Sequence, residues 1–538
     1  MSFFSKRKLR KLFRNPKLFF YDFFRIRGQQ IFGVHLENIS DQKNSLDNNH
    51  RLTIKVSETP KSAEQQIEIG KMSTKSSPQT QYTQEQIASL APPKYADFFI
   101  KELKRVYSNP YGGLTYPLLD EQIFLQNQHN LKSFWKPFTE SFLSQGIRQE
   151  QAQPKIRSVQ KINMPKKGKI KVAVLSENFH FMKPLYQSGV INQYVDFVEV
   201  KFTDISRGFS KQHAKFPLLD HLHAHGQLVA RGTNASDIDK VFSAFARYFP
   251  DQYLAVQQAD IVWSEWWVHP TVWVSRYLPD DTKIISRCHA YEVFTYWPHL
   301  IDFSRIDQNI FVADHIKTIA KKSFESFAAI DDFKNHIIRN YVDFSSFTTK
   351  KLPNAQFTLG MVQWGDYNKN PLKALHLLEK LVKIDSRFNI KFAGKPFANP
   401  VNETERLYKE MFEQAAKRLE SHIEFSGFVT DMPAWYQQVG FVVNCSRRES
   451  QSVALCEGAA SGAIPIVIEW SMLQDFQAAR LIYPGYTHND IDQAVEAVLN
   501  HQSDFEVSRM KVSHQFRSEF GLDTTAKQTL DLILKVMN

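Results

Sequence analysis

Short apolar runs rich in β-branched residues alternate with helix-like stretches over most of the chain after residue 167. The first series of runs lies at Ile170–Leu175, Phe197–Phe202, Ile261–Trp263, Lys283–Ser286 and Gln308–Val312. A second series lies at Phe357–Val362, Asn389–Ala393, His422–Phe425, Phe441–Asn444 and Ile464–Ile468. Apolar runs of this length, bounded by polar residues and separated by helices, are typical of buried strands in parallel sheets. The pattern therefore predicts two doubly wound α/β units.

The segment between the two series divides the chain. Residues 336–347 (HIIRNYVDFSSF) interrupt the alternation and are interpreted as a linker. We place the first unit at residues 168–348, the second at 349–525 and a C-terminal helix at 526–538. Ligands of such sheets bind beyond the carboxyl ends of the strands. The two units are therefore expected to face each other across a cleft that holds the site.

The first 35 residues combine cations with aromatic side chains. Leu9, Leu12 and Phe13 recur at the spacing of one helical face, and most of the charged residues around them are Lys or Arg. A basic helix with an aromatic stripe is typical of a segment that lies on an anionic membrane surface. The alternatives are that the stripe packs on the protein's own core, or that the arm binds nucleic acid. No nucleic-acid-binding signature accompanies it, so no nucleic-acid partner is expected.

Two further segments precede the first unit. Residues 36–94 are rich in Ser, Gln, Asn and Lys, which predicts a flexible polar linker. Residues 95–167 regain helical patterning and are expected to form a helical lead-in that packs against the first unit. The chain is therefore expected to carry an N-terminal helical extension.

Composition narrows the class of protein. A length of 538 residues requires more than one domain, and the formal net charge of +11 favours an anionic partner. No run of about 18 apolar residues predicts a transmembrane helix, and the charged N-terminus does not resemble a signal peptide. Cys288, Cys445 and Cys456 lack metal-ligand spacing and are expected to be buried, reduced thiols. These features predict a cytoplasmic protein that lies peripherally on the inner face of the cell membrane.

The candidate chemistry is concentrated in residues 441–470 (FVVNCSRRESQSVALCEGAASGAIPIVIEW). A strand leads into a polar loop, and a helix is expected to start near Ser450 or Ser452 and to end before Gly462. A helix N-terminus beside cations is a suitable site for a diphosphate. The polar candidates in this stretch are Arg447, Arg448, Glu449, Ser452 and Glu457.

This stretch resembles the E-x7-E element of retaining glycosyltransferases of the GT-B class, in particular the large family 4. The matching positions are Ser446, Glu449, Glu457, Gly462, Pro465 and Val467. The resemblance implies two Rossmann-like domains facing a cleft. It also implies that Glu449 contacts hydroxyls of a donor sugar and that Glu457 contacts the ribose of its nucleotide.

Weaker matches to the same family extend over roughly residues 168–530. FTLGMVQWGDYNKNP places Lys369 on the donor diphosphate, with Lys395 as a second candidate, and ISRCHAYE places His289 near the reactive centre. Three departures stand out. Met361 replaces the family arginine, Tyr341 replaces the glycine of the interdomain turn, and SENFHFMKP stands where the family has a glycine-rich loop. Acceptor contacts therefore cannot be carried over.

The resemblance implies a retaining glycosyltransferase that moves a hexose from a nucleotide-diphosphate sugar to a glycan or lipid-linked acceptor. The opening segment is similar to those of bacterial capsule and surface-polysaccharide transferases, which suggests that pathway. No cofactor is expected, because the nucleotide sugar is a substrate. No metal is expected either, since the DxD strings at Asp237–Asp239 and Asp490–Asp492 follow no apolar strand.

Several alternatives stay open. The chain could be a non-catalytic scaffold or sugar-binding component of an assembly complex, a polyol-phosphate polymerase, or a nucleotide-sugar epimerase. Lys369 could be an ordinary surface lysine, His289 a core histidine, and the arginines cations beside a helix. An aromatic cluster could stack an acceptor sugar or simply pack in the core. It contains Trp263, Trp266, Trp267 and Trp273, with Glu265 and His269.

Overall fold

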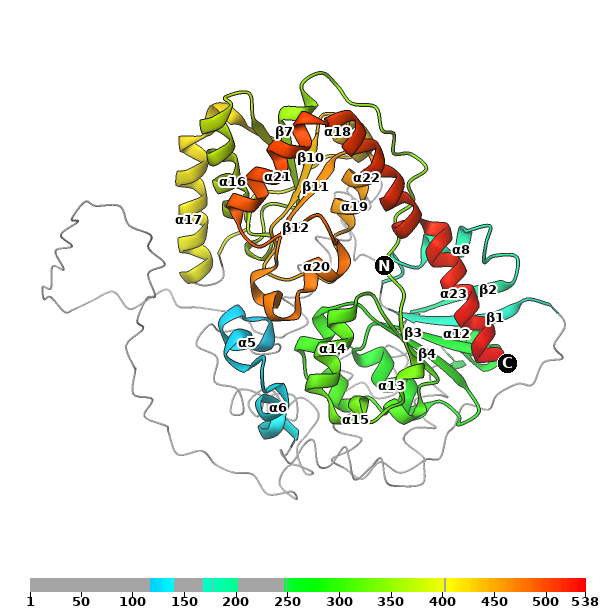
Figure 1. Ribbon diagram of the computed structural model, residues 1–538. Helices are drawn as coiled ribbons and strands as arrows, with labels where there is room; N and C mark the ends of the chain where they lie inside the picture. The colour runs from blue at the N-terminus through cyan, green and yellow to red at the C-terminus, as the bar shows by residue number, and fades with distance from the viewer. Residues whose placement is uncertain (1–116, 140–167, 177, 202–245, 248, 401–402) are drawn as a thin grey trace, which may run out of the picture. The chain divides into compact units, whose positions relative to one another are not determined.

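The computed structural model describes residues 117–139, 168–176, 178–201, 246–247, 249–400 and 403–538 (Figure 1). The predicted membrane arm at 1–35 and the predicted linker at 36–94 lie outside the described residues, as does most of the lead-in. Within the described ranges, no helix is long and apolar enough to cross a membrane.

The first unit is built on a parallel six-stranded sheet in the order β2-β1-β3-β4-β5-β6. Its strands are β1 (Ile170–Ser176), β2 (Val195–Lys201), β3 (Ile261–Glu265), β4 (Lys283–Cys288), β5 (Gln308–Phe311) and β6 (Asn335–Ile337). Its helices are α8 (Lys183–Gln187), α12 (Pro250–Gln258), α13 (His269–Tyr277), α14 (Asp314–Ser323) and α15 (Glu325–Ala328). The five predicted strands are confirmed. β6 takes the first residues of the segment interpreted as a linker.

The second unit is also built on a parallel six-stranded sheet, in the order β12-β11-β10-β7-β8-β9. Its strands are β7 (Thr358–Val362), β8 (Asn389–Ala393), β9 (Ile423–Gly427), β10 (Phe441–Asn444), β11 (Ile464–Ile468) and β12 (Thr487–His488). Its helices are α16 (Pro371–Ile384), α17 (Glu403–Arg418), α18 (Met432–Tyr436), α19 (Val453–Ala460), α20 (Ala478–Ile482), α21 (Ile491–Ser503) and α22 (Phe505–Phe520). Strand β12 has only two residues, which is too short to produce a recognisable pattern of apolar and polar residues.

The strand orders fix where ligands can bind. In the first sheet the order reverses between β1 and β3, and in the second between β7 and β10. At such a reversal the connections leave the two neighbouring strands towards opposite faces, which opens a crevice beyond their carboxyl ends. The loops that follow β1 and β3, and those that follow β7 and β10, are therefore the places to look for a site.

The end of the chain returns to the first unit. Helix α23 (Leu522–Met537) buries Ala526, Leu530 and Ile533 in one apolar cluster with strand residues of β1 and β3. The amide of Val342 donates to the carbonyl of Phe520 at 2.9 Å, which fixes the linker to the end of α22. The C-terminal helix therefore forms part of the hydrophobic core of the first unit.

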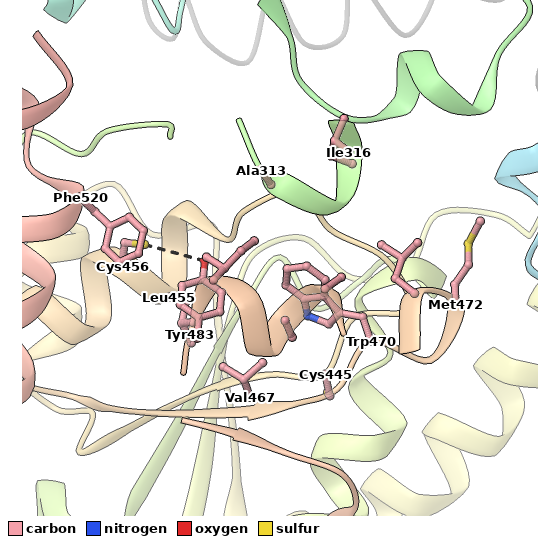
Figure 2. Packing of buried hydrophobic residues seen from close by; sticks show 14 of the residues in the cluster. Ala313, Ile316, Cys445, Leu455, Cys456, Val467, Trp470, Met472, Tyr483 and Phe520 are labelled. Carbon is pink, nitrogen blue, oxygen red and sulfur yellow. Dashed lines mark hydrogen bonds between the residues drawn. The ribbon is translucent and has the colours of Figure 1, made fainter. Parts of the chain in front are cut away.

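Apolar packing also continues from one unit into the other. Figure 2 shows Ala313 and Ile316, at the start of α14, above the buried side chains of Trp470, Met472 and Tyr483 from the second unit. All three cysteines are buried and unbonded, as predicted, and Cys445 and Cys456 belong to this same region. The contact joins the two units through closely packed side chains.

The described part of the lead-in bridges both units rather than only the first. Its helices are α5 (Glu121–Asn127) and α6 (Leu131–Thr139). α6 packs against α14 of the first unit. Phe124 of α5 is fully buried, with its ring 5.3 Å from Phe294 of the first unit and 6.1 Å from Phe476 of the second.

The linker is fixed by Tyr341, which replaces the expected glycine. Its hydroxyl donates to the carbonyl of Phe181 at 2.6 Å and accepts from the amide of Leu185 at 3.3 Å. Burial raises the pKa of Tyr341 to about 12, so the hydroxyl keeps its proton near neutral pH. One side chain thus holds the segment after β1 against the linker.

Replacing Tyr341 with Phe should lower the free energy of unfolding by about 1–2 kcal/mol, because the Phe181 carbonyl and the Leu185 amide lose a buried partner. Urea titration of the full chain measures the change. Tyr194→Phe is the control, since Tyr194 is 49% exposed and its removal should cost little. Equal midpoints for the two variants would contradict the assigned role of Tyr341.

A second prediction concerns His315, a buried α14 residue whose Nε2 lies 2.9 Å from the Glu449 carbonyl of the second unit. Burial lowers the pKa of His315 to about 4, whereas an unfolded histidine titrates near about 6.5. Between these values the unfolded chain binds a proton that the folded chain does not. Stability should therefore fall as the pH falls from about 6.5 to 4, by on the order of 3 kcal/mol.

The His315→Gln variant should lose part of this pH dependence, measured as the free energy of unfolding at several pH values in that window. His514→Gln is the matched control, because His514 is exposed on α22 and should leave the slope unchanged. Parallel slopes for wild type and His315→Gln would rule out the assignment.

Candidate functional site

The loops after β7 and β10 are joined to each other by hydrogen bonds of Asn368. Its carbonyl accepts from the amide of Arg447 at 2.7 Å, and its side-chain amide donates to the carbonyl of Arg448 at 3.1 Å. Asp366 shapes the first loop by accepting from the amide of Asn368 at 2.7 Å. The two strands at the reversal point therefore present one continuous polar rim.

Lys369 and Glu449 form an ion pair on this rim. The Lys369 ammonium contacts Oε1 of Glu449, and the hydroxyl of Ser446 donates to the same oxygen at 2.9 Å. The two charged side chains are only 20% and 13% exposed. Since water screens such a pair poorly, each charge strongly affects any ligand that enters between them.

Asn370 explains how Lys369 reaches this position. Its backbone is left-handed, with φ 55°, at the residue before α16. Asn tolerates this conformation better than most residues. Its side-chain oxygen also accepts from the Tyr408 hydroxyl at 2.9 Å. The turn directs the chain from the loop into the helix directly after Lys369.

Helix α19 begins as predicted. Ser452 is its N-cap and accepts from the amide of Leu455 at 3.3 Å, while its own amide donates to the Tyr483 hydroxyl at 2.9 Å. Gly462 follows the helix in a left-handed conformation with φ 78°. The Ser452 hydroxyl is therefore used to cap the helix. Glu457 lies within α19, where its Oε2 is 3.4 Å from the Tyr436 hydroxyl.

The remaining predicted cations differ in their surroundings. The Arg447 guanidinium pairs with Glu121 of α5 at 2.5 Å and lies 4.0 Å from the centre of the Tyr367 ring. Arg448 contacts the Asn368 side chain at 3.3 Å, beside the Lys369–Glu449 pair. Lys395 is exposed after β8. A Cβ atom placed on Gly365 would lie only 2.1 Å from the carbonyl oxygen of Lys395. The loops after β7 and β8 therefore run close together.

Glu121 was missed by the sequence analysis. Besides Arg447 it binds the hydroxyl of Ser471, which donates to its Oε1 at 2.7 Å. Both partners lie more than 300 residues further along the chain than Glu121, and no local sequence pattern predicts such a pairing. Met361, which replaces the family arginine, is buried in the core.

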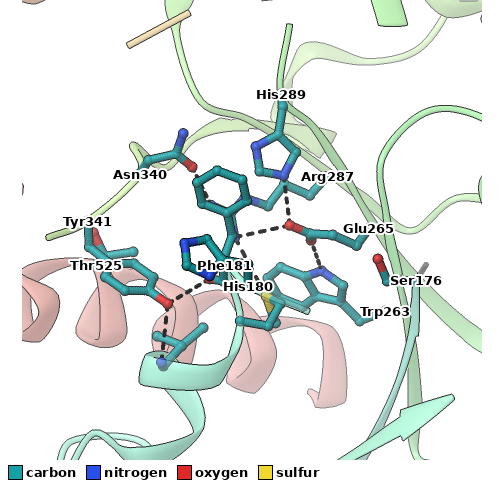
Figure 3. A network of polar contacts seen from close by, with 12 residues as sticks. Ser176, His180, Phe181, Trp263, Glu265, Arg287, His289, Asn340, Tyr341 and Thr525 are labelled. Carbon is teal, nitrogen blue, oxygen red and sulfur yellow. Dashed lines mark hydrogen bonds and ion pairs between the residues drawn. The ribbon is translucent and has the colours of Figure 1, made fainter. Parts of the chain in front are cut away.

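A second polar group forms at the ends of β3 and β4, beside the reversal point of the first sheet (Figure 3). Nε2 of His289, after β4, lies 2.7 Å from Oε1 of Glu265, at the end of β3. Trp263 donates its indole N–H to Oε2 of Glu265 at 2.8 Å. Trp266 stacks on the His289 ring with the centroids 3.9 Å apart. Of the four tryptophans in the predicted cluster, Trp263, Trp267 and Trp273 are core residues.

Glu265 is fully buried, and its neighbours determine its charge. Burial alone would raise the pKa of Glu265, but Arg287, His289 and the hydrogen bonds from His289 and Trp263 outweigh burial and lower it below the ordinary value. Glu265 is therefore ionised near neutral pH.

Hydrogen bonds connect the two groups. Arg287 donates to the side chain of Asn340 at 2.6 Å. The amide of Asn340 donates to Oε1 of Gln451 at 2.8 Å, and Nε2 of Gln451 donates back to the Asn340 carbonyl at 2.6 Å. Gln451 stands between Glu449 and the start of α19. Among the described residues, no cluster of three or more His, Cys, Asp or Glu side chains could hold a metal ion.

Many solved structures are similar to this chain at low sequence identity, and three of them illustrate the likeness. A UDP-forming α,α-trehalose-phosphate synthase from Burkholderia xenovorans is 13% identical, with 68% of this chain and 98% of that chain covered and a TM-score of 0.47. A glycosyltransferase from Rickettsia africae is 12% identical, with 69% and 100% covered and a TM-score of 0.46. TarM from S. aureus is 13% identical, with 52% and 54% covered and a TM-score of 0.41. The chain thus spans about half the length of TarM.

A search of the curated proteins found no match to the sequence. A family model does match. Residues 359–501 match the family described as glycosyl transferases group 1, which covers the second sheet from β7 onward together with the loops of Lys369 and Glu449. These residues are thus similar to a glycosyl transferase group 1 domain, and the two parallel-sheet α/β units give the chain a GT-B-type fold.

Proposed function

We propose that this protein transfers a hexosyl group from a nucleotide-diphosphate sugar to a glycan or lipid-linked acceptor, with retention of anomeric configuration. The observation that carries the proposal is the Lys369–Glu449 ion pair at the strand-order reversal of the group 1 domain. It places one cation and one carboxylate where ligands of such sheets bind.

The two charges suit opposite ends of a donor. When the bond between the sugar and the diphosphate breaks, negative charge grows on the leaving phosphate, and a cation already in place stabilises that charge. In this proposal, the donor diphosphate replaces Glu449 as the partner of Lys369. The Glu449 carboxylate then accepts hydrogen bonds from hydroxyls of the sugar.

The other residues have supporting roles in the proposal. Arg448 and the N–H groups at the start of α19, capped by Ser452, contribute further positive potential at the diphosphate. Lys395 approaches the phosphates from the loop after β8, and Glu457 binds the ribose. Arg447 acts through the loop, because its guanidinium is held by Glu121. His289 acts on the first unit's side of the reacting sugar.

The biological setting is part of the proposal. We propose that the enzyme works in capsule or surface-polysaccharide assembly on the cytoplasmic face of the membrane, held there by its basic N-terminal arm. It requires neither a metal nor a cofactor. The chief rivals are a non-catalytic scaffold with the same fold and a polyol-phosphate polymerase.

Release of the nucleotide from a panel of UDP-, GDP- and CMP-activated sugars, with and without membrane glycan extract, tests the proposal. Wild type should turn over one donor class. Glu449→Gln and Lys369→Met should each lower the rate by about 100-fold or more, because each removes a charge aligned with the transition state. Glu424→Gln and Lys391→Met are the matched controls. They break an ion pair of the same kind on strands β8 and β9, away from the loops after β7 and β10.

Each rival predicts a different result. A scaffold would bind a nucleotide sugar without releasing nucleotide. A polyol-phosphate polymerase would release CMP from a CDP-activated polyol and leave every sugar donor intact. Equal loss in the Glu424→Gln control and in Glu449→Gln would show that the effect is not specific to the site.

A further inference from the structure

We propose that Glu265 is a positioning residue for His289: it holds the hydrogen of the ring on Nε2, so that Nδ1 is the atom offered to a hydroxyl of the substrate. The catalytic role of this pair rests on the proposed function. The position of the ring hydrogen on Nε2 rests only on the geometry of the first unit.

The sheet brings the two residues together. Glu265 ends β3 and His289 follows β4, and these strands are parallel neighbours with Glu265 opposite Arg287 in the register. Both side chains are almost fully shielded from water, with exposed fractions of 0% for Glu265 and 5% for His289. A contact of 2.7 Å between Oε1 and Nε2 is a short, well-formed hydrogen bond.

The charge of Glu265 decides which partner donates. The Arg287 guanidinium lies beside the carboxylate, with its NH1 3.5 Å from Oε1, and helps to keep Glu265 ionised. An ionised carboxylate can only accept hydrogen bonds. Both oxygens therefore face donors, the indole N–H of Trp263 on one side and the Nε2–H of His289 on the other. The neutral ring must then have its lone pair on Nδ1.

The ring itself is held in one orientation. Trp266 stacks on it, and the ring of Phe181 lies 5.0 Å away. The backbone amide of His289 donates to Glu292 at 2.8 Å, which fixes the main chain beneath the ring. Trp266 does this from a left-handed backbone with φ 75°, a conformation that a bulky residue rarely adopts.

Backbone strain of this kind is typical of functional sites. The strained Trp266 is therefore better explained by a need to hold the His289 ring in one orientation than by core packing alone. Figure 3 shows the second ring nitrogen of His289 on the side away from Glu265. In this position Nδ1 can accept a hydrogen bond from a sugar or acceptor hydroxyl while Glu265 stabilises any positive charge that develops on the ring.

The Glu265→Gln variant tests the pair with almost no change of shape. A glutamine has one acceptor oxygen and one NH₂ group, so it cannot accept from both Trp263 and His289. If its oxygen keeps Trp263, its NH₂ faces Nε2 and drives the hydrogen to Nδ1. We expect kcat to fall about 10- to 100-fold with little change in KM for the donor. Glu265→Asp, which keeps the charge, should recover part of that loss.

Nitrogen-15 NMR of protein with labelled histidine shows directly which ring nitrogen of His289 carries the hydrogen. His289 signals are assigned by their absence in His289→Asn. Wild type should show the Nε2–H form, and Glu265→Gln should show a shift towards Nδ1–H. Glu325→Gln is the control, because Glu325 is an exposed carboxylate of the same unit and should change neither the spectrum nor kcat.

The outcomes separate this inference from the proposed function. An Nδ1–H ring in wild type overturns the inference even if Glu265→Gln does not fold. Unchanged kcat and unchanged signals in a folded Glu265→Gln overturn it as well. Wild type that turns over no donor but shows the Nε2–H ring refutes the proposed function and leaves the hydrogen-bonded pair standing.

Discussion

The ion pair between Lys369 and Glu449 depends on a specific strand order. Because β7 and β10 are neighbours although about 80 residues separate them, the loops that follow them meet, and Asn368 links the two backbones. In a sheet whose strands followed the order of the chain, these loops would be several strands apart. Two opposite charges that are mostly shielded from water attract strongly, and each also needs a partner whenever the other is engaged. A donor with an anionic diphosphate and a hydroxyl-rich sugar offers a partner to each, which is why the pair is a reasonable place for such a ligand.

The loop after β10 is also one of the places at which the first unit contacts the second. His315 approaches the Glu449 carbonyl, and Gln451 exchanges two hydrogen bonds with Asn340, which in turn binds Arg287 next to Glu265. A rotation of one unit against the other would have to break these bonds or carry the loop with it. The position of Glu449 is therefore set jointly by both units, and the two polar groups are parts of one hydrogen-bonded system.

The sequence predicted what depends on local pattern. Ten strands follow from apolar runs, the start and end of α19 follow from Ser452 and Gly462, and the fold class is confirmed. Lys369 and Glu449 were selected from motifs, and the structure brings them together. Strands β6 and β12 are too short to produce a pattern. Glu121 could not be found, because a carboxylate on a short helix gives no sign that its partner lies beyond residue 440. Glu265 was noted among aromatic residues, but its contact with His289 depends on the register of β3 against β4.

Glu121 also changes how the cations of the site are ranked. By sequence, Arg447 and Arg448 are equivalent neighbours of a helix N-terminus. In the structure, Arg447 is already neutralised by Glu121 and stacked on Tyr367, so its charge contributes little to a phosphate a few ångströms away. Arg448 points to the loop that carries Lys369. Because Glu121 also binds Ser471 and its helix buries Phe124 between the two units, Arg447 is better understood as the anchor of the lead-in helix. In the proposed site, the positive potential at the rim then comes mainly from Lys369, Arg448 and the amides of α19. The lead-in acts on that site by fixing the loop after β10, which bears Arg448 and leads into α19.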